Sequence, residues 1–282
     1  MMNANDYAQQ ASEIFILSDS FVRIKELIDD ESSTIDDIAE IILLDPALTG
    51  SILKLANSSF FNYPGKIDTV SKALLVLGIT EVYNLVIAFF TKKAFKALAL
   101  DSDYLDDFWC KSVDCALILK YIGEQLDVAN AERLFILGLL HNLGELVIQQ
   151  LAPEKGNVAN KYAAPELPWQ AQVQQLGFSY AECSAELLKQ WQLPFNIIEP
   201  IRQQDETDFS YSTDETKLLY IAKRIMLMQY ECNSHPDELM LSPEVMQLFP
   251  ITDNMIKGAN EFCDFERLAV LAILNPGAAM VY

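Results

Sequence analysis

The chain is poor in histidine and in basic residues. Only two of its 282 residues are histidines, His141 and His235. Catalytic zinc and iron sites commonly take two or three imidazoles from one pocket, so a histidine-based metal centre has little support from composition. Lys and Arg number 20 against 40 Asp and Glu, which gives a net charge of −20. Such a surface repels phosphate backbones and anionic headgroups, so we expect no nucleic-acid partner and no membrane partner.

The sequence shows no sign of disulfides, of a signal peptide or of long apolar runs. The five cysteines are odd in number and form no CxxC pair, which indicates reduced thiols. The N-terminus, MMNANDYAQQASE, has neither a basic start nor an apolar stretch and does not resemble a signal peptide. Apolar runs such as 85–90 and 268–274 are far shorter than the roughly 18–20 residues that span a bilayer. We therefore expect a cytoplasmic protein.

Apolar residues recur at intervals of three and four along the whole chain, which is the period of an amphipathic helix. Asp45-Pro46 predicts a helix start, and Ser179 with Glu182 forms a capping box that predicts another. No stretch alternates apolar and polar residues as a sheet strand does, so the fold class is all-α. The long helices are expected at 80–98, 104–125, 131–151, 179–192 and 213–232.

The sequence also predicts the local structure of three further segments. Residues 57–66 are rich in turn formers and should be a structured loop, with Asn57 bracing it. Residues 153–168 hold three prolines and no periodicity, which predicts a surface connection. Residues 262–274 should form a helix with one buried apolar stripe, made of Phe262, Phe265, Leu268, Ala269 and Ala272.

Two stretches resemble a known family. LDPALT at 44–49 is followed by LKLANS at 53–58, and a helix rich in aliphatic residues then ends in Leu77-Gly78. GLLHNLGEL at 138–146 is similar to a GLLHDIG stretch, and Trp109, Gly177-Phe178 and LLKQWQLP at 187–194 follow the same order. Together, over about residues 15–228, the pattern resembles the HDOD family, the HD-related output domain of bacterial signalling proteins.

The resemblance implies an all-helical, two-lobed domain whose second lobe is related to the HD phosphohydrolases. On this basis residues 10–230 form the HDOD-like domain, with an N-terminal helical lobe at 10–100 and an HD-like lobe at 101–230. Residues 231–282 are expected to be a helical extension packed on the second lobe. Members of the family usually serve in signal transduction, and no general catalytic activity attaches to them.

The HD phosphohydrolases bind divalent metals through histidines and aspartates, and the chain departs from that ligand pattern. Lys111 stands where the related pattern places a histidine, and Asn142 replaces the aspartate that follows His141. Tyr180 stands where many relatives have histidine, and Gln203-Gln204 stands where a histidine pair is common. We therefore expect no catalytic residue, no metal and no cofactor. The predicted vestigial pocket consists of Lys111, His141, Asn142, Glu145, Tyr180, Gln203 and Gln204.

Alternatives remain for the two most informative residues. His141 is either a hydrogen-bonded core residue or a surviving ligand, because a lone histidine among leucines fits both. Lys111 either borders the place of the missing metal, with Asn142 and Glu145 as its partners, or points to solvent. No GxSxG, P-loop or Rossmann glycine pattern offers another chemistry.

The leading hypothesis is a non-catalytic signal-transduction module that binds an unidentified signalling protein or a small effector. The alternative is a metal-dependent phosphohydrolase of the HD superfamily, and the tally of metal ligands opposes it. A third hypothesis is a sensor that holds an anionic group in the vacated pocket through Lys111 and Asn142.

Overall fold

The structure, a computed structural model, describes residues 2–15, 17–58, 61, 63–96, 100–128, 132–163, 165–230, 240, 241, 245, 247 and 249–274. The regular elements in these residues are helices, and no strand occurs among them, so the predicted all-α fold is confirmed. His235 and the predicted helix ends at 97–98, 131 and 231–232 lie outside the described residues.

The contacts divide the chain into two compact units, residues 1–15 with 98–263 and residues 16–97 with 264–282. Unit 1 contains α1 (Ala4–Ile14), α7 (Ser102–Gln125), α8 (Glu132–Leu140), α9 (Leu143–Leu151), α10 (Pro153–Ala159), α11 (Pro168–Leu176), α12 (Tyr180–Gln190), α13 (Phe195–Gln203) and α14 (Asp214–Tyr230). Unit 2 contains α2 (Asp19–Asp29), α3 (Ile35–Leu43), α4 (Pro46–Ala56), α5 (Val70–Leu77) and α6 (Ile79–Lys96). The last helix, α17 (Asp253–Leu274), contributes its first part to unit 1 and its second part to unit 2. The domain boundaries drawn from the resemblance stay a prediction.

Short-range polar contacts set the local structure of unit 2. Asp45 caps α4 by accepting two backbone hydrogen bonds from its first turn, and Pro46 is the first helical residue, as the Asp-Pro pair predicts. Asn57 braces the loop that follows α4, because its Nδ2 donates to the carbonyl of Ile67 at 2.6 Å and its Oδ1 accepts from the Ile67 N–H at 2.8 Å. The predicted structural role of Asn57 is confirmed.

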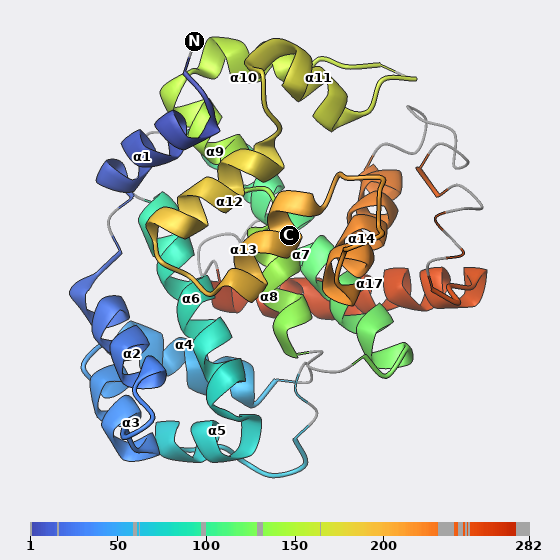
Figure 1. The fold of residues 1–282 in the computed structure, drawn as a ribbon. Coiled ribbons are helices and arrows are strands. Elements are labelled where there is room, and N and C mark those ends of the chain that lie inside the picture. The colour runs from blue at the N-terminus through green and yellow to red at the C-terminus, as the bar shows by residue number, and fades with distance from the viewer. Residues whose placement is uncertain are drawn as a thin grey trace. The chain divides into compact units, whose positions relative to one another are not determined.

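The central helix of unit 1 is α7, which is buried from Ser112 to Leu119. Helix α8 packs directly on α7, as Figure 1 shows, and α14 packs on both. The approach of α8 to α7 is close enough to require glycine: a Cβ atom at Gly138 would lie 2.4 Å from Cα and 2.6 Å from N of Ala116. These are backbone atoms, which cannot rotate out of the way.

We expect Gly138→Ala to destabilise the fold by about 1–3 kcal/mol, because the added methyl group must push α8 and α7 apart. Urea unfolding measures the effect. Gly50→Ala is the matched control, since Gly50 is an exposed residue of α4 with nothing within 4 Å of its added Cβ. It should stabilise the protein by about 0.5–1 kcal/mol through helix propensity. Equal effects of the two substitutions would contradict the close packing of α8 on α7.

The single helix predicted for residues 131–151 is wrong, because the chain breaks between α8 and α9. His141 and Asn142 form a turn, and Asn142 has φ −121° and ψ 20°. The break turns α9 against α12, where a Cβ atom at Gly144 would lie 2.2 Å from the carbonyl oxygen of Tyr180. Tight packing on α12 therefore overrides the continuous apolar period of the sequence.

The connection predicted for residues 153–168 is also partly wrong. Residues 153–159 form α10, with Pro153 at its first position, where a proline costs no hydrogen bond. Gly156 and Ala159 are the buried residues of this short helix. A single buried pair is too short a pattern for periodicity to reveal.

The stripe predicted for α17 is wrong at Phe265 and Leu268, which are 75% and 54% exposed. The buried positions are instead Ala259, Cys263, Glu266, Val270 and Leu271. In the first part of the helix, Cys263 Sγ lies 3.6 Å from the Asp114 carbonyl oxygen. The buried face of the helix therefore includes small and charged residues as well as apolar ones, and an apolar stripe does not identify it.

Among the described residues, the stretch 133–151 is by itself long and apolar enough to span a membrane. In this stretch 72% of the most apolar 18-residue window is buried inside the protein. A buried core helix passes the same test, and this stretch is broken at His141. Helices α5 and α6 pass only when counted as one span, although they are bent by 119°. The cytoplasmic location stays a prediction.

Candidate functional site

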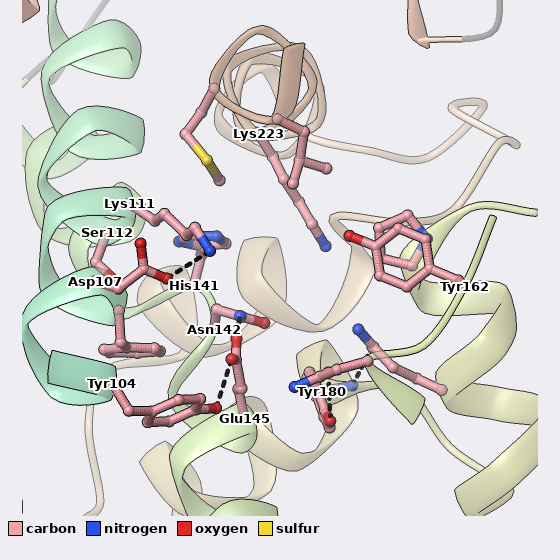
Figure 2. A pocket seen from close by; sticks show the side chains of 16 residues that line it. Tyr104, Asp107, Lys111, Ser112, His141, Asn142, Glu145, Tyr162, Tyr180 and Lys223 are labelled. Carbon is pink, nitrogen blue, oxygen red and sulfur yellow. Dashed lines mark hydrogen bonds and ion pairs between the residues drawn. The ribbon is translucent and has the colours of Figure 1, made fainter. Parts of the chain in front are cut away.

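A cavity of about 220 Å³ opens in unit 1 where the turn between α8 and α9 meets α7, α12 and α14. Figure 2 shows the polar side chains that converge on it from these elements. The lining consists of Tyr104, Asp107, Phe108, Lys111, Ser112, His141, Asn142, Glu145, Asn160, Tyr162, Pro168, Gln172, Tyr180, Lys223, Met226 and Leu227. Five of the seven residues predicted to form the vestigial pocket are in this set, and Gln203 and Gln204 are not.

His141 is a buried, neutral imidazole. Its Nδ1 lies 2.7 Å from the carbonyl oxygen of Gly138, so Nδ1 carries the proton and donates it to that carbonyl. Burial and, to a smaller extent, the nearby Lys223 ammonium together lower the pKa of His141 to about 3. The free nitrogen, Nε2, is therefore left as a hydrogen-bond acceptor.

A hydrogen-bond network fixes Glu145 in the wall of the cavity. The Tyr104 hydroxyl donates to Glu145 Oε1 at 2.6 Å, and the Asn142 side-chain amide donates to Oε2. Asn160 accepts from the Tyr180 hydroxyl at 2.9 Å. Burial raises the pKa of the Glu145 carboxyl, while the two donors oppose that rise. Both carboxylate oxygens are thus committed to the protein's own side chains.

The most deeply buried cation of the site is Lys223, which sequence reasoning missed. Its side chain is 7% exposed, and its ammonium donates to both oxygens of Asp205, at 2.7 and 3.0 Å. The ammonium also lies 4.9 Å from the centre of the Trp169 ring. Burial lowers the pKa of Lys223, and the Asp205 carboxylate opposes the change. In the sequence Lys223 looks like an ordinary charged residue of α14, and only its position opposite Asp205 reveals the pair.

Lys111 borders the cavity, but its partners differ from those predicted. Its ammonium pairs with Asp107, one turn earlier on α7, at 2.7 Å, and its side chain is 39% exposed. Asn142 donates to Glu145 instead of accepting from Lys111. Figure 2 shows Lys111 reaching from α7 while Lys223 reaches from α14. Lys111 is thus a rim residue of the cavity, and the buried charge belongs to Lys223.

The two glutamines of the predicted pocket have structural contacts instead. Gln204 is fully buried, and its Nε2 donates to the carbonyl oxygens of His141 and Ile201, each at 2.8 Å. Gln203 Nε2 donates to Glu199 on its own helix, α13. Gln204 therefore holds the backbone of the His141 turn without lining the cavity, and Gln203 makes no such contact with the turn. Whether the predicted residues act together as a functional site stays a prediction.

The side chains of the cavity do not fit the divalent metal that the HD superfamily implies. The lining offers one imidazole, and an ammonium beside it repels any second cation. The carboxylates of Asp107 and Glu145 already pair with Lys111, Tyr104 and Asn142. Within the described part of the chain, no three His, Cys, Asp or Glu side chains gather as metal ligands would.

The comparisons with known proteins agree with the observed fold. The sequence pattern of the HDOD domain matches residues 14–207. An uncharacterized protein of Treponema pallidum (strain Nichols) is 27% identical over 205 residues, which cover 71% of this chain and 39% of that protein. The chain thus spans about two fifths of the length of this curated relative.

Two solved structures cover almost the whole chain. A protein of Shewanella amazonensis SB2B, named as a candidate phosphohydrolase, superposes with a TM-score of 0.70 at 23% identity over 95% of this chain and 96% of its own. An HDOD domain protein of unknown function from Geobacter sulfurreducens gives a TM-score of 0.66 at 20% identity over 96% and 99%.

A third structure, named as a candidate signal-transduction protein of Marinobacter aquaeolei VT8, gives a TM-score of 0.69 at 18% identity over 98% of this chain and 66% of its own. At such low identities these likenesses show the fold alone. The family pattern, however, covers well over half of the chain. The chain therefore belongs to the HDOD family.

Proposed function

We propose that the chain is a non-catalytic signal-transduction module that acts by binding a protein partner or a small effector. The observation that carries the proposal is the buried ammonium of Lys223 beside the neutral His141. Membership of the HDOD family, and a fold shared with a candidate signal-transduction protein, support the assignment to signalling.

Hydrolysis of a phosphoester by an HD-type site needs metal ions that polarise the phosphoryl oxygen and generate hydroxide near neutral pH. In this cavity the Lys223 ammonium supplies the positive charge, but an ammonium has no open coordination position to activate water. Asn142 brings an amide to the position after the histidine, and its Nδ2 is turned toward Glu145. The local chemistry thus favours binding over hydrolysis.

The alternative, a metal-dependent phosphohydrolase, is tested directly with the purified full chain. We expect no phosphate release from p-nitrophenyl phosphate or from a cyclic dinucleotide above the background without protein, in the presence of Mn²⁺, Fe²⁺ or Mg²⁺. His141→Gln should behave as the wild type does, because His141 performs no chemistry. Metal-dependent turnover that disappears in His141→Gln would establish the phosphohydrolase and overturn the proposal.

A further inference from the structure

The Lys223 ammonium lies between a carboxylate and the cavity. Lys223 lines the cavity, whereas its partner Asp205 does not. An ammonium has three N–H donors, and the two hydrogen bonds to Asp205 use two of them. Among the described residues, no oxygen or nitrogen atom other than those of Asp205 accepts a hydrogen bond from this ammonium, and the Trp169 ring beside it does not line the cavity. The side of the ammonium away from Asp205 therefore offers a charged donor to whatever enters the cavity.

Other groups around the cavity can add to this donor. Ser112 is 1% exposed and brings a hydroxyl from α7, while Gln172 uses its Oε1 on the Tyr180 N–H and keeps its Nε2 for other acceptors. Lys111 stands at the rim with a second ammonium. Donors from α7, α11 and α14 thus face one small space.

The two carboxylates of the lining are shielded from a negatively charged ligand. Both oxygens of Glu145 accept hydrogen bonds, from Tyr104 and Asn142. Asp107 pairs with Lys111 at the rim, where its side chain is 55% exposed and water screens its charge. Lys223 is the buried charge of the lining, and its carboxylate partner, Asp205, does not line the cavity. The interior of the cavity therefore favours an anion over a cation.

The size of the cavity limits the ligand. Its volume of about 220 Å³ is below the roughly 300–1,000 Å³ typical of sites for drug-sized ligands. Apolar side chains of Phe108, Met226 and Leu227 leave room for a short hydrocarbon part beside the polar groups. A compact oxyanion with a small body fits these limits.

We propose that this cavity binds the oxyanion group, carboxylate or phosphate, of a small effector, and that the Lys223 ammonium is its main anchor. The inference rests on the proposed function and specifies the chemistry of its effector. The net charge of −20 slows the approach of an anion, but at physiological salt this repulsion is screened beyond about 8 Å, and the local donors decide binding.

Isothermal titration of the full chain with inorganic phosphate and, separately, with acetate tests the proposal, with sodium chloride as the ionic-strength control. We expect saturable binding of at least one of the two. Phosphate alone would identify a phosphorylated effector, and acetate alone a carboxylate effector. Loss of one charge-assisted hydrogen bond in Lys223→Met should weaken binding by about 10- to 150-fold.

Lys217→Met is the matched control, because Lys217 lies on the same helix and pairs with Asp214 away from the cavity lining. It should bind like the wild type. If Lys223→Met does not fold, Ser112→Ala provides a second variant, in which loss of one hydroxyl donor should weaken binding by about 2- to 10-fold.

Two results would overturn the inference: no saturable binding of either anion to the wild type, or equal affinity in the wild type and the cavity variant that folds. This failure is distinguishable from failure of the proposed function. The inference is judged from anion binding, whereas the proposed function is judged from hydrolysis, so a chain that neither binds these anions nor hydrolyses phosphoesters would still be a non-catalytic module.

Discussion

Asp205→Ala is expected to lower the free energy of unfolding by about 3–5 kcal/mol, because it leaves the Lys223 ammonium buried without its counter-ion. The two side chains are 11% and 7% exposed, and both carboxylate oxygens accept from the same ammonium. Removing the acid therefore forces the lysine to lose its proton or to draw water into the core, and both cost free energy. Urea unfolding at neutral pH measures the loss.

Two controls separate this effect from a general response to losing an acidic side chain. Glu261→Ala breaks the exposed pair with Lys257, whose side chains are 69% and 77% exposed. It should change stability by no more than about 0.5 kcal/mol. Adding Lys223→Met to Asp205→Ala should recover much of the loss, because the uncompensated charge is then gone. A double variant as unstable as Asp205→Ala would show that the pair is not the cause.

The backbone architecture follows closely from local signals in the sequence. Ser179 and Glu182 form the predicted capping box of α12, with the Ser179 N–H bonded to Glu182 and the Glu182 N–H bonded to Ser179. The two partners of such a cap lie within four residues of each other, so a short segment of the sequence is enough to recognise the interaction. The same holds for Asp45 and Pro46 at the start of α4. These two helix starts were predictable for this reason, and the helix type was predictable from the apolar period.

Features that depend on tertiary packing were not predictable in this way. The turn at His141 interrupts a stretch with a continuous apolar period, and α9 after the turn passes close to the Tyr180 carbonyl. The exposed positions of Phe265 and Leu268 likewise depend on which side of α17 meets the rest of the protein. Periodicity identifies an apolar face, but it does not say how near a neighbouring backbone lies.

The site was half predictable for a related reason. His141, Asn142 and Glu145 are neighbours in sequence, and the family resemblance pointed to them together. The Lys223 and Asp205 pair joins α14 to the segment after α13, and nothing in either segment marks the other as its partner. One signal was available: Asp205 directly follows the two glutamines at the expected ligand positions, so a partner for it could have been sought.

The stability of the protein should fall on acidification because of His141. The ordinary pKa of histidine, 6.5, applies to the unfolded chain, whereas the folded pKa is about 3. Between these values the unfolded state binds a proton that the native state does not, so the contribution of His141 is fully present above pH 6.5 and is lost as pH falls toward 3. From pH 7 to pH 4 the loss amounts to about 3 kcal/mol.

Urea unfolding of wild type and His141→Gln at pH 7 and pH 4 measures this loss as the difference between the two proteins. Glutamine does not titrate and can still donate to the Gly138 carbonyl, so His141→Gln should lose about 3 kcal/mol less than the wild type on acidification.

Glu145 acts in the opposite direction, because its raised pKa gives a contribution to stability that is present at low pH and is lost as pH rises. Both proteins share that carboxyl, so it cancels in the comparison. Glu145→Gln provides the opposite control, with a steeper loss on acidification than the wild type. Parallel pH profiles for wild type and His141→Gln would mean that His141 is not held neutral, and the account of a buried imidazole beside the Lys223 ammonium would then be wrong.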